Sequence, residues 1–546
     1  MLQKIGFLPG FNKQITPTGA EAQWTGGENV RFRYGTPEKI GGWAQLGESK
    51  LTGAARALHH MVNKSSQKFA AIGTNKILYA YTGGVYYDIH PLVNPSGTAI
   101  TNAFTTTYNS KEVTITFSVA PGFVAGDIIL FGGAGTFTSI TNSDYTAADF
   151  ADKKYMVTSA PTSTTITITM DSVESNVTGA TTSGGITYYR YYHVGPAEQV
   201  GAYGWGISLF GGNILGAVTT TLNGTLSDNT YGTGGSGTDI TLTSTTGLPT
   251  SGTNYITVGT IGSVAGSEMI SYTGVSGNNI TGITRGVLNS TRQSWISGSA
   301  VTNASSFTGW GSPAANTDKV TDPGLWSLDN LGGTLIALIH NGSVFEWDSD
   351  ATNATSTRAT IISGAPTASR DMLVSTPDRH LVLFGTETTI GDTTTQDDMF
   401  IRFSDQEDIT DWAPTAINSA GTQRLAAGSR IMGAKLGRNA LYVWTDTSLF
   451  TMRFVGQPFT FAYEQVGTNC GLIGMNAAVE VDGAAYWMSD NGFFRFTGKL
   501  ESMDCLVEDY VYEDINTVSN QLIYCGINNL FGEITWFYPT STSNVV

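Results

Sequence analysis

The chain has 546 residues, of which 40% are hydrophobic and only 13% are charged, and its formal net charge is −16. This composition excludes a disordered chain, and the acidic balance disfavours a free nucleic-acid-binding protein, whose affinity depends on neutralising phosphate. The length exceeds a single hydrophobic core, and the abundance of glycine, threonine and aromatic residues without a 3.6-residue apolar period predicts an all-β protein of two to four domains.

The N-terminal sequence MLQKIGFLPGFNK lacks the apolar run and cleavage site of a secretory signal, and no 18-residue apolar stretch predicts a membrane span. The first clear element is a hairpin over Asn75–Ile89, in which side chains alternate with a period of two around Gly83 and Gly84. We assign residues 1–99 to an N-terminal segment followed by the first strands of a β-platform.

Two stretches differ from this hairpin in composition, because they are rich in threonine and serine and predict short strands of Thr and Ile. Residues 100–190, with a turn at Val124–Asp127, and residues 226–302 each predict a small β-barrel or sandwich module. Residues 191–225, which contain YGWG, are interpreted as platform sequence resumed between the modules, and TGWG follows the second module. Both modules are predicted to be insertions, because the entropy cost of closing a loop grows slowly with its length.

Residues 303–546 contain further hairpins with the same alternating pattern as the first one, and these hairpins recur along the chain at a regular spacing. Leucine or another apolar residue marks one strand of each repeat, at Leu335, Leu381, Leu441, Ala485 and Ile534. The intervals are 46, 60, 44 and 49 residues by subtraction, close to the ~40–50 residues of a four-stranded propeller blade. We therefore predict an all-β fold: a β-propeller platform with two inserted small β-barrel or sandwich modules.

The last of these strands, in EITWFYP, has no return partner in the sequence after it. An unpaired strand edge is a liability, so either the N-terminal strands close the ring here or the chain is a truncated piece of a longer one. We favour the second interpretation, in which the last blade is incomplete.

No motif in the chain predicts catalysis, a metal or a cofactor. The six histidines and three cysteines show no zinc-ligand spacing, and no nucleophile elbow or phosphate-binding loop is present. One weak signal points elsewhere: WMSDNGFF resembles the Asp-box turn of sialidase propellers, with Asp490 and Gly492 in place but Met488 at the serine position. A glycan-binding or glycan-cleaving propeller, acting as a host-surface adhesin or depolymerase, is therefore the alternative function.

Carboxylates cluster in DDMFIRFSDQED, and a solvated acidic surface or a divalent-ion site explains them better than a catalytic pair does. Five of them are candidates for a channel lumen or a subunit interface: Asp397, Asp398, Asp405, Glu407 and Asp408.

Five segments in order resemble the tail nozzle proteins of short-tailed bacteriophages, also called tail tubular protein B or packaged-DNA stabilisation proteins. They are Glu28–Trp43, the split pair of YGWG (Tyr203–Gly206) and Leu325–Leu338, Pro366–Gly385, Ile401–Leu425 and Thr445–Gly474. The two predicted modules are not part of this resemblance.

The resemblance implies a structural virion protein without catalytic residues or cofactors. It implies a ring, typically a hexamer, that lies below the portal and adaptor in the viral tail and is assembled in the cytoplasm of the bacterial host. Its partners would be further copies of itself, the tail adaptor protein and tail fibre or needle proteins, with transient contact to the viral genomic DNA and possible contact to the host surface. Six copies would carry −96, six times −16, and an acidic lumen repels phosphate, so that DNA slides without sticking.

Overall fold

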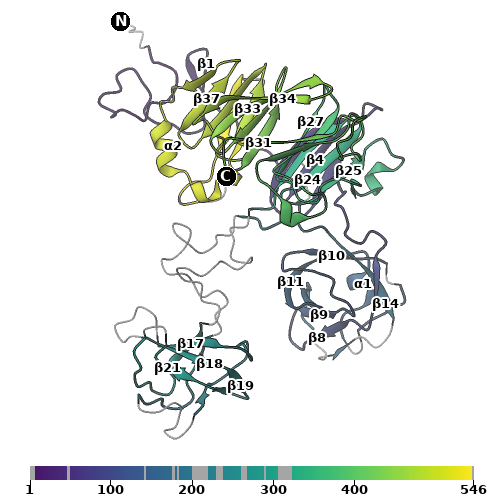
Figure 1. The fold of residues 1–546 in the computed structure, drawn as a ribbon, viewed down its shortest axis with the longest axis vertical. Coiled ribbons are helices and arrows are strands. Elements are labelled where there is room, and N and C mark those ends of the chain that lie inside the picture. The colour runs from purple at the N-terminus through teal and green to yellow at the C-terminus, as the bar shows by residue number, and fades with distance from the viewer. Residues whose placement is uncertain are drawn as a thin grey trace. The chain divides into compact units, whose positions relative to one another are not determined.

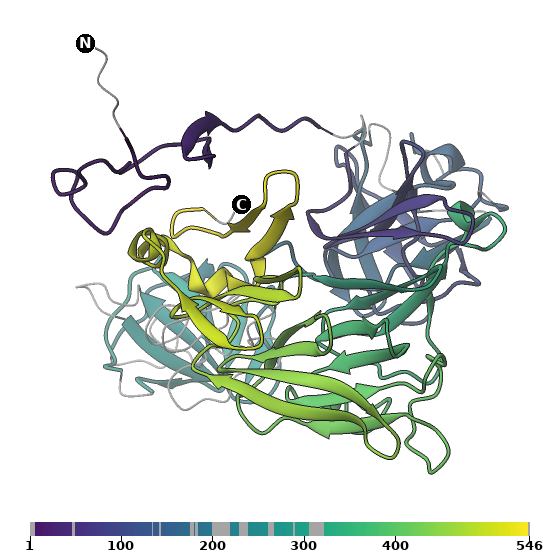
Figure 2. The same ribbon diagram turned by 90° about the horizontal axis from the view of Figure 1, so that it is seen from above.

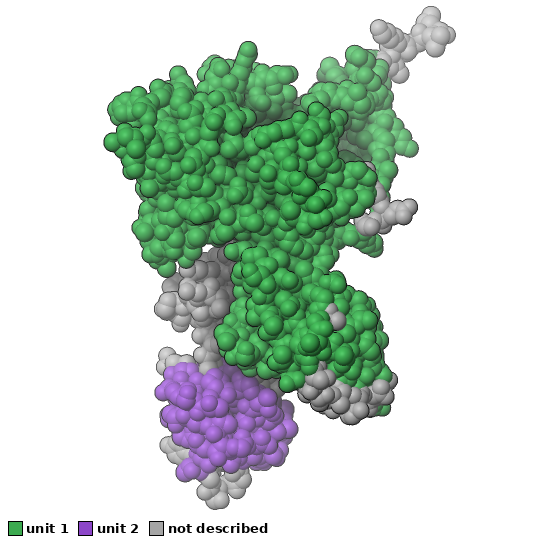
Figure 3. Space-filling model, turned by 90° about the vertical axis from the view of Figure 1, so that its right-hand side faces the viewer, with its two compact units in different colours: residues 1–200, 322–546 green, residues 201–321 purple. Residues whose placement is uncertain are grey.

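The computed structural model divides the chain into two compact units, residues 1–200 with 322–546 and residues 201–321 (Figure 3). The structure describes residues 6–45, 50–133, 135–140, 143–174, 179–180, 184–198, 219–228, 238–259, 267–287, 290–304 and 322–543. Within these ranges the chain is almost entirely strand, turn and loop, and the longest α-helix is α2 (Glu508–Asp514). No described helix has the length and apolar character needed to cross a membrane.

The larger unit contains five antiparallel sheets of four strands each, which we call blades 1 to 5 (Figure 1). The predicted propeller platform is confirmed. Blade 1 consists of β3 (Ala55–Val62), β4 (Lys68–Thr74), β5 (Leu78–Thr82) and β6 (Val85–Asp88), and blade 2 consists of β23 (Trp326–Leu331), β24 (Thr334–Ile339), β25 (Val344–Asp348) and β26 (Thr360–Ile361). Blade 3 consists of β27 (Asp371–Ser375), β28 (His380–Phe384), β29 (Phe400–Phe403) and β30 (Gly421–Arg424), and blade 4 consists of β31 (Ile431–Leu436), β32 (Leu441–Thr445), β33 (Ser448–Gly456) and β34 (Thr460–Thr468). Blade 5 consists of β35 (Ala478–Val481), β36 (Ala484–Ser489), β37 (Gly492–Phe496) and β38 (Leu500–Met503).

A sixth sheet, blade 6, has two strands among the described residues, β39 (Tyr524–Asn528) and β40 (Glu533–Phe537). The prediction that the last strand lacks a partner is wrong, because the strand that carries Ile534 pairs with β39, which precedes it in the chain. The sequence EITWFYP looked unpaired because its partner, YCGIN, lacks the alternating apolar pattern of the other strands.

The five marker positions of the sequence repeat, Leu335, Leu381, Leu441, Ala485 and Ile534, all lie in the second strand of their sheets. The hairpin over Asn75–Ile89 differs from the others, because it forms the third and fourth strands of blade 1 rather than the second and third. Its turn is nevertheless as predicted: Gly83 and Gly84 have φ of 59° and 86°, which a two-residue hairpin turn requires.

The first strands of successive blades lie side by side, and polar side chains join them. His59 of β3 contacts the side-chain oxygen of Asn330 at 2.8 Å, and Asp329 accepts a hydrogen bond of 2.8 Å from the backbone N–H of Val374. Asp371 of β27 likewise accepts one of 3.1 Å from the backbone N–H of Ala434 in blade 4. Hydrogen bonds between first strands thus join blade 1 to blade 2, blade 2 to blade 3 and blade 3 to blade 4.

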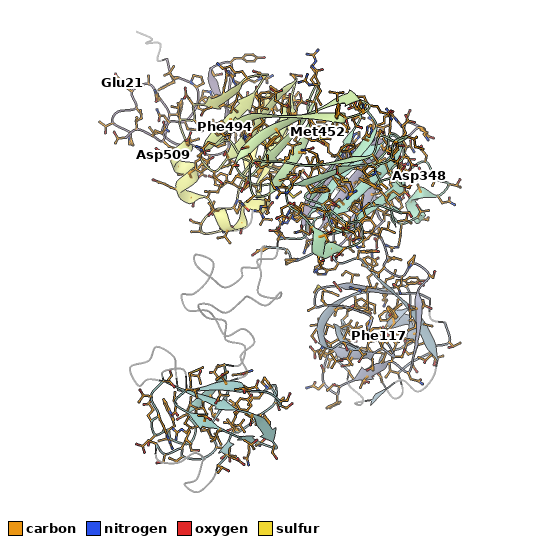
Figure 4. The ribbon with its side chains drawn as sticks, viewed as in Figure 1. Glu21, Phe117, Asp348, Met452, Phe494 and Asp509 are labelled. Carbon is orange, nitrogen blue, oxygen red and sulfur yellow. The ribbon has the colours of Figure 1, made fainter. Side chains whose placement is uncertain are left out.

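Apolar layers fill the spaces between adjacent blades. Each layer is centred on large aromatic side chains, which bury more apolar area than any other residue type. The fully buried tryptophans of the platform are Trp326, Trp347, Trp412, Trp444 and Trp487. Figure 4 marks Met452 in the layer between blades 3 and 4, where its side chain is buried.

Both predicted modules lie in one connection, between β6 of blade 1 and β23 of blade 2. The first module is a single curled sheet in the order β13-β8-β9-β12-β11-β10-β14-β7 around an aromatic core that includes Phe117 (Figure 4). Its elements are β7 (Thr98–Thr101), β8 (Phe104–Thr106), β9 (Glu112–Thr116), β10 (Ile128–Phe131), α1 (Ala147–Phe150), β11 (Lys154–Thr162), β12 (Thr165–Thr169), β13 (Gly179–Ala180) and β14 (Gly185–Arg190).

The second module is the smaller unit, a pair of sheets around the apolar cluster that includes Ile256 and Tyr272. The sheets have the orders β15-β22-β17-β18-β21 and β16-β20-β19. Their strands are β15 (Thr219–Thr221), β16 (Ile240–Thr241), β17 (Asn254–Gly259), β18 (Ser267–Tyr272), β19 (Gly274–Ser276), β20 (Asn279–Thr281), β21 (Thr284–Arg285) and β22 (Ala300–Asn303).

The segment between the modules differs from the prediction of a platform segment over residues 191–225. Residues 191–198 form no strand, although Tyr192 packs against Phe345 of blade 2 with ring centroids 4.8 Å apart. Thr219–Thr221 pairs with β22, so this part of the segment belongs to the second module. The YGWG and TGWG sequences lie outside the described residues.

The N-terminal segment contains a hairpin, β1 (Val30–Arg33) with β2 (Thr36–Lys39), that pairs with no other strand among the described residues. Its contacts are with the last part of the chain (Figure 2). The guanidinium of Arg31 lies 3.5 Å from the ring centroid of Phe531 and its Nε lies 3.2 Å from Glu533. The N-terminal hairpin therefore adjoins blade 6 through side chains, without adding strands to it.

Candidate functional site

The acidic segment Asp397–Asp408 does not form one cluster. β29 runs through it, so Asp397 and Asp398 lie before the first residue of this strand, whereas Asp405, Glu407 and Asp408 lie after its last residue. A strand advances about 3.3 Å per residue and keeps its two ends apart. The structure brings the five candidate residues together as two groups at opposite ends of blade 3.

The first group is neutralised by arginine. Arg370 holds Asp398 with two hydrogen bonds, of 2.7 Å from Nε and 2.9 Å from Nη2, the bidentate geometry that makes such pairs strong. Arg424 pairs with Asp397 at 2.6 Å. Burial would raise the pKa of Asp397, but the hydrogen bond and the charge of Arg424 outweigh it and leave that pKa below its usual value.

Arg370 also connects this group to blade 2. Its Nη1 lies 3.5 Å from a carboxylate oxygen of Asp322, which His340 contacts at 3.2 Å. Burial acts to raise the pKa of Asp322, and the hydrogen bond from His340 together with neighbouring positive charges lowers it overall. Cations and carboxylates alternate here, so this end of blades 2 and 3 has little net charge.

The second group is differently built. Asp405 accepts hydrogen bonds from the backbone N–H and hydroxyl of Ser419 at 2.7 Å and 2.5 Å, and Asp408 accepts from Thr410. Glu407 pairs with Arg379 at 2.6 Å, but the two side chains are 62% and 45% exposed, and such surface pairs contribute little to stability. This end of blade 3 keeps its negative charge, and whether it faces a lumen or an interface stays a prediction.

The Asp-box resemblance has a simple structural basis. Ser489 pairs with Gly492, so Asp490 and Asn491 form the turn between β36 and β37, and Gly492 has a φ of 135°. Burial, followed by the charge of Asp446, raises the pKa of Asp490. The segment is therefore the turn of a β-hairpin.

A polar junction centred on the largely buried Asp88, unforeseen from the sequence, joins the first module to blades 1 and 2. Asp88, the last residue of β6, pairs with Arg358 at 2.9 Å and with Lys154 of β11 at 2.8 Å. The hydroxyl of Tyr191 also donates to Asp88, and its ring stacks on His90 with centroids 4.9 Å apart. We call Asp88, Arg358, Lys154, Tyr191 and His90 the blade–module junction.

Burial and neighbouring charges shift the pKa values of Asp88 and His90 in this junction. Burial would raise the pKa of Asp88, but the charges of Arg358 and Lys154 and their hydrogen bonds lower it to about 2. Burial lowers the pKa of His90 to about 4, so that its ring is neutral at physiological pH. A neutral His90 fits its contacts, since it accepts from the backbone N–H of Leu78 and its other nitrogen lies 3.0 Å from the carbonyl of Tyr192.

A cavity of about 510 Å³ lies between blade 1 and blade 6. Its walls are mostly apolar and come from β3 and from the start of β39. The lining residues are Leu51, Ala55, Arg56, Ala57, Leu58, Ile72, Leu325, Asn476, Gln521, Leu522, Ile523, Tyr524 and Phe537. Cavities of this size and character hold apolar groups, but no convergent set of polar side chains distinguishes one ligand from another here.

Within the described ranges, no group of three or more His, Cys, Asp or Glu side chains could hold a metal ion. The three cysteines, Cys470, Cys505 and Cys525, are all free. Burial raises the pKa of the Cys525 thiol to about 12, so this thiol is a packing group rather than a nucleophile.

No protein-family model matches the chain, and no curated protein matches it. Among solved structures it is similar to the endosialidase of phage phi92, with 12% sequence identity and a TM-score of 0.15 over 90% of this chain and 64% of that one. It is also similar to the extracellular domain of a hybrid two-component system of B. thetaiotaomicron, with 10% identity and a TM-score of 0.23 over 82% of this chain and 60% of that one. The chain thus spans less than two thirds of either protein, and at such TM-scores these likenesses support no argument about activity or ligand.

Proposed function

We propose that this chain is a structural virion protein, the subunit of a ring that forms the tail nozzle of a short-tailed bacteriophage. The observation that carries the proposal is where the resembling segments fall. Among the described residues, one segment forms the N-terminal hairpin and four lie in consecutive order in blades 2, 3 and 4 and the loop that follows blade 4, while neither predicted module, residues 100–190 or 226–302, contains one. The resemblance therefore follows the platform and the N-terminal hairpin beside it rather than the two modules.

The mechanism is assembly and gating rather than bond chemistry. Six platforms around a channel would line the path by which the genome leaves, and loops of the platform or modules would narrow it. The net charge of −16 on each copy repels phosphate, which lets DNA pass without being held. The tail adaptor on one side and fibre or needle proteins on the other are the expected partners.

The rival function is a glycan-binding or glycan-cleaving propeller. Such an enzyme would work as a monomer or small oligomer and would need a pair of carboxylates at a fixed separation around a sugar. The Asp-box turn is its only sequence support, and a single copy with Met488 at the serine position is a weak one.

The test is the assembly state of the purified full chain. Light scattering coupled to size-exclusion chromatography measures the mass relative to the 57.9 kDa of one chain, and negative-stain images show whether particles have a central hole. We expect rings of about six copies. A stable monomer that hydrolyses host oligosaccharides would refute the nozzle and establish the rival.

A further inference from the structure

Three apolar side chains project from one end of blades 3 and 4, and we call them the hairpin patch: Ile417, Val455 and Phe459. Val455 and Phe459 lie at the tip of the long hairpin β33–β34, and Ile417 lies in the loop before β30. The hydroxyl of Thr460 donates a 3.1 Å hydrogen bond to the carbonyl of Ser419, which joins the hairpin tip to that loop. Ile417 is 92% exposed and Phe459 is 79% exposed.

Three carboxylates lie on the segment that is hydrogen-bonded to the Ile417 loop, and we call Asp405, Asp408 and Asp411 the acidic rim. Hydroxyl and amide donors hold them: Ser419 for Asp405, Thr410 for Asp408, and the Asn418 side chain, at 2.9 Å, for Asp411. These donors orient the carboxylates without neutralising them. Hydrogen bonds from Thr410 lower the pKa of Asp408, so its charge is present at neutral pH.

The N-terminal hairpin carries the complementary character. Tyr34 lies at its turn, is 93% exposed and has a φ of 50°, while Trp43, which follows the hairpin, is 95% exposed. Arg33 and Lys39 on the same hairpin are exposed, and the Arg33 guanidinium lies 5.3 Å from the Tyr34 ring centroid. We call Arg33, Tyr34, Lys39 and Trp43 the N-terminal hook.

Fully exposed Tyr and Trp beside arginine is the composition of an interface anchor, since these three residue types dominate binding hot spots. The hook is aromatic and basic, whereas the hairpin patch is aliphatic and aromatic with an acidic rim, so the two surfaces match in both polarity and charge. Figure 2 shows the N-terminal segment and the tip of hairpin β33–β34 at opposite edges of the platform. Two complementary surfaces on opposite edges produce head-to-tail association, which closes into a ring when the rotation per copy allows it.

We propose that the N-terminal hook of one copy docks on the hairpin patch and acidic rim of the next copy. This inference rests on the proposed function, because it names the contact by which the ring would assemble. The occupant is a second copy of this chain, and docking of the hook within its own chain or on another protein are outcomes that the test separates.

The test uses three double variants of the full chain. The hook variant is Tyr34→Ser with Trp43→Ser, and the patch variant is Ile417→Ser with Phe459→Ser. The control is Val119→Ser with Ile296→Ser, which removes apolar side chains that are 76% and 75% exposed in the two modules. Because all six side chains lie on the surface, melting temperatures within about 1 °C of the wild type are expected for all three proteins.

Light scattering should show that the hook and patch variants are each monomers of 57.9 kDa, while the control assembles like the wild type. The decisive measurement is an equimolar mixture of the hook and patch variants. Each pair of copies retains one intact hook and one intact patch, so the mixture should yield a dimer of twice that mass and no larger species.

A mixture that remains monomeric, or hook and patch variants that assemble like the wild type, would overturn the inference. If the wild type forms rings that both variants leave intact, only the inference fails. If the wild type forms open chains that both variants abolish, the inference stands and the nozzle proposal fails. A wild type that stays monomeric at all concentrations overturns both.

Discussion

Replacing Asp88 with asparagine tests whether the blade–module junction stabilises the platform. The side chain keeps its shape and loses its charge, while Arg358 and Lys154 stay in place 2.9 Å and 2.8 Å away. Removing one partner of a buried ion pair is costly because the remaining charges lose their compensation. Blade 1, blade 2 and the first module all meet at this carboxylate, so the variant should weaken all three contacts at once.

The magnitude follows from the pKa of Asp88, which falls from 3.8 to about 2 on folding. A shift of this size corresponds to roughly 2.4 kcal/mol of stability at neutral pH. The unit that contains the junction, residues 1–200 and 322–546, has 425 residues by addition. With an unfolding entropy of about 2.1 cal/mol/K per residue, the melting temperature of Asp88→Asn should fall by about 3 °C.

The pH dependence provides the sharper test, measured by differential scanning calorimetry. The folded-state pKa of Asp88 lies below its unfolded value, so its contribution is complete above about pH 4 and is lost as the pH falls toward about 2. The difference in melting temperature between wild type and Asp88→Asn should therefore shrink between about pH 4 and pH 2.5. Glu407→Gln, which breaks an exposed pair, is the control and should melt like the wild type. An equal difference at all pH values, or none at pH 7, would refute the assignment.

Two further substitutions test the packing of the modules and the platform. In the second module, Arg285 pairs with Glu268 at 2.6 Å and both side chains are fully buried. Calorimetry should therefore show that Arg285→Met destabilises that unit by roughly 3–5 kcal/mol and that adding Glu268→Met restores most of the loss. An Arg285→Met variant that melts like the wild type would contradict the buried pair. In blade 1, a Cβ on Gly73 would lie 2.6 Å from the Trp326 ring, so Gly73→Ala should lower the free energy of unfolding by roughly 1–3 kcal/mol. The control is Gly526→Ala, whose added Cβ would have nothing within 4 Å and should not change stability. Equal melting temperatures for these two variants would show that Trp326 can move aside.

The blade repeat could be predicted because it is a local property of the chain. HLVLF in β28 is buried at every position, and TLIALI in β24 is buried at all but its first residue. Such short apolar runs, bounded by turns and recurring every 44 to 60 residues, indicate stacked sheets without any knowledge of their partners. The sequence could not place the hairpin over Asn75–Ile89 correctly within its sheet, because strand order depends on which neighbour pairs, and β3 carries no comparable signal.

The acidic segment shows where local pattern fails. Asp397 and Asp408 are close in sequence but lie at opposite ends of β29, and their charges depend on distant residues. Arg370 lies 28 residues from Asp398 and Arg424 lies 27 residues from Asp397, separations set by blade geometry. The blade–module junction was missed for the same reason, because Arg358 is 270 residues from Asp88.

That long separation also bears on why the platform tolerates its insertions. The connection from β6 to β23 spans residues 89–325, which is 237 residues by subtraction. Lengthening a connection from about eight residues to this length is about five doublings, and each doubling costs about 0.6 kcal/mol in closure entropy, so the upper bound is about 3 kcal/mol. The pKa shift of Asp88 corresponds to roughly 2.4 kcal/mol, which Arg358 of blade 2 and Lys154 of the first module share, and the pair with Arg358 ties blade 1 directly to blade 2. The ion pairs of this one carboxylate thus offset much of the closure entropy that the two modules cost, and they add to the apolar cluster that packs blade 1 against blade 2.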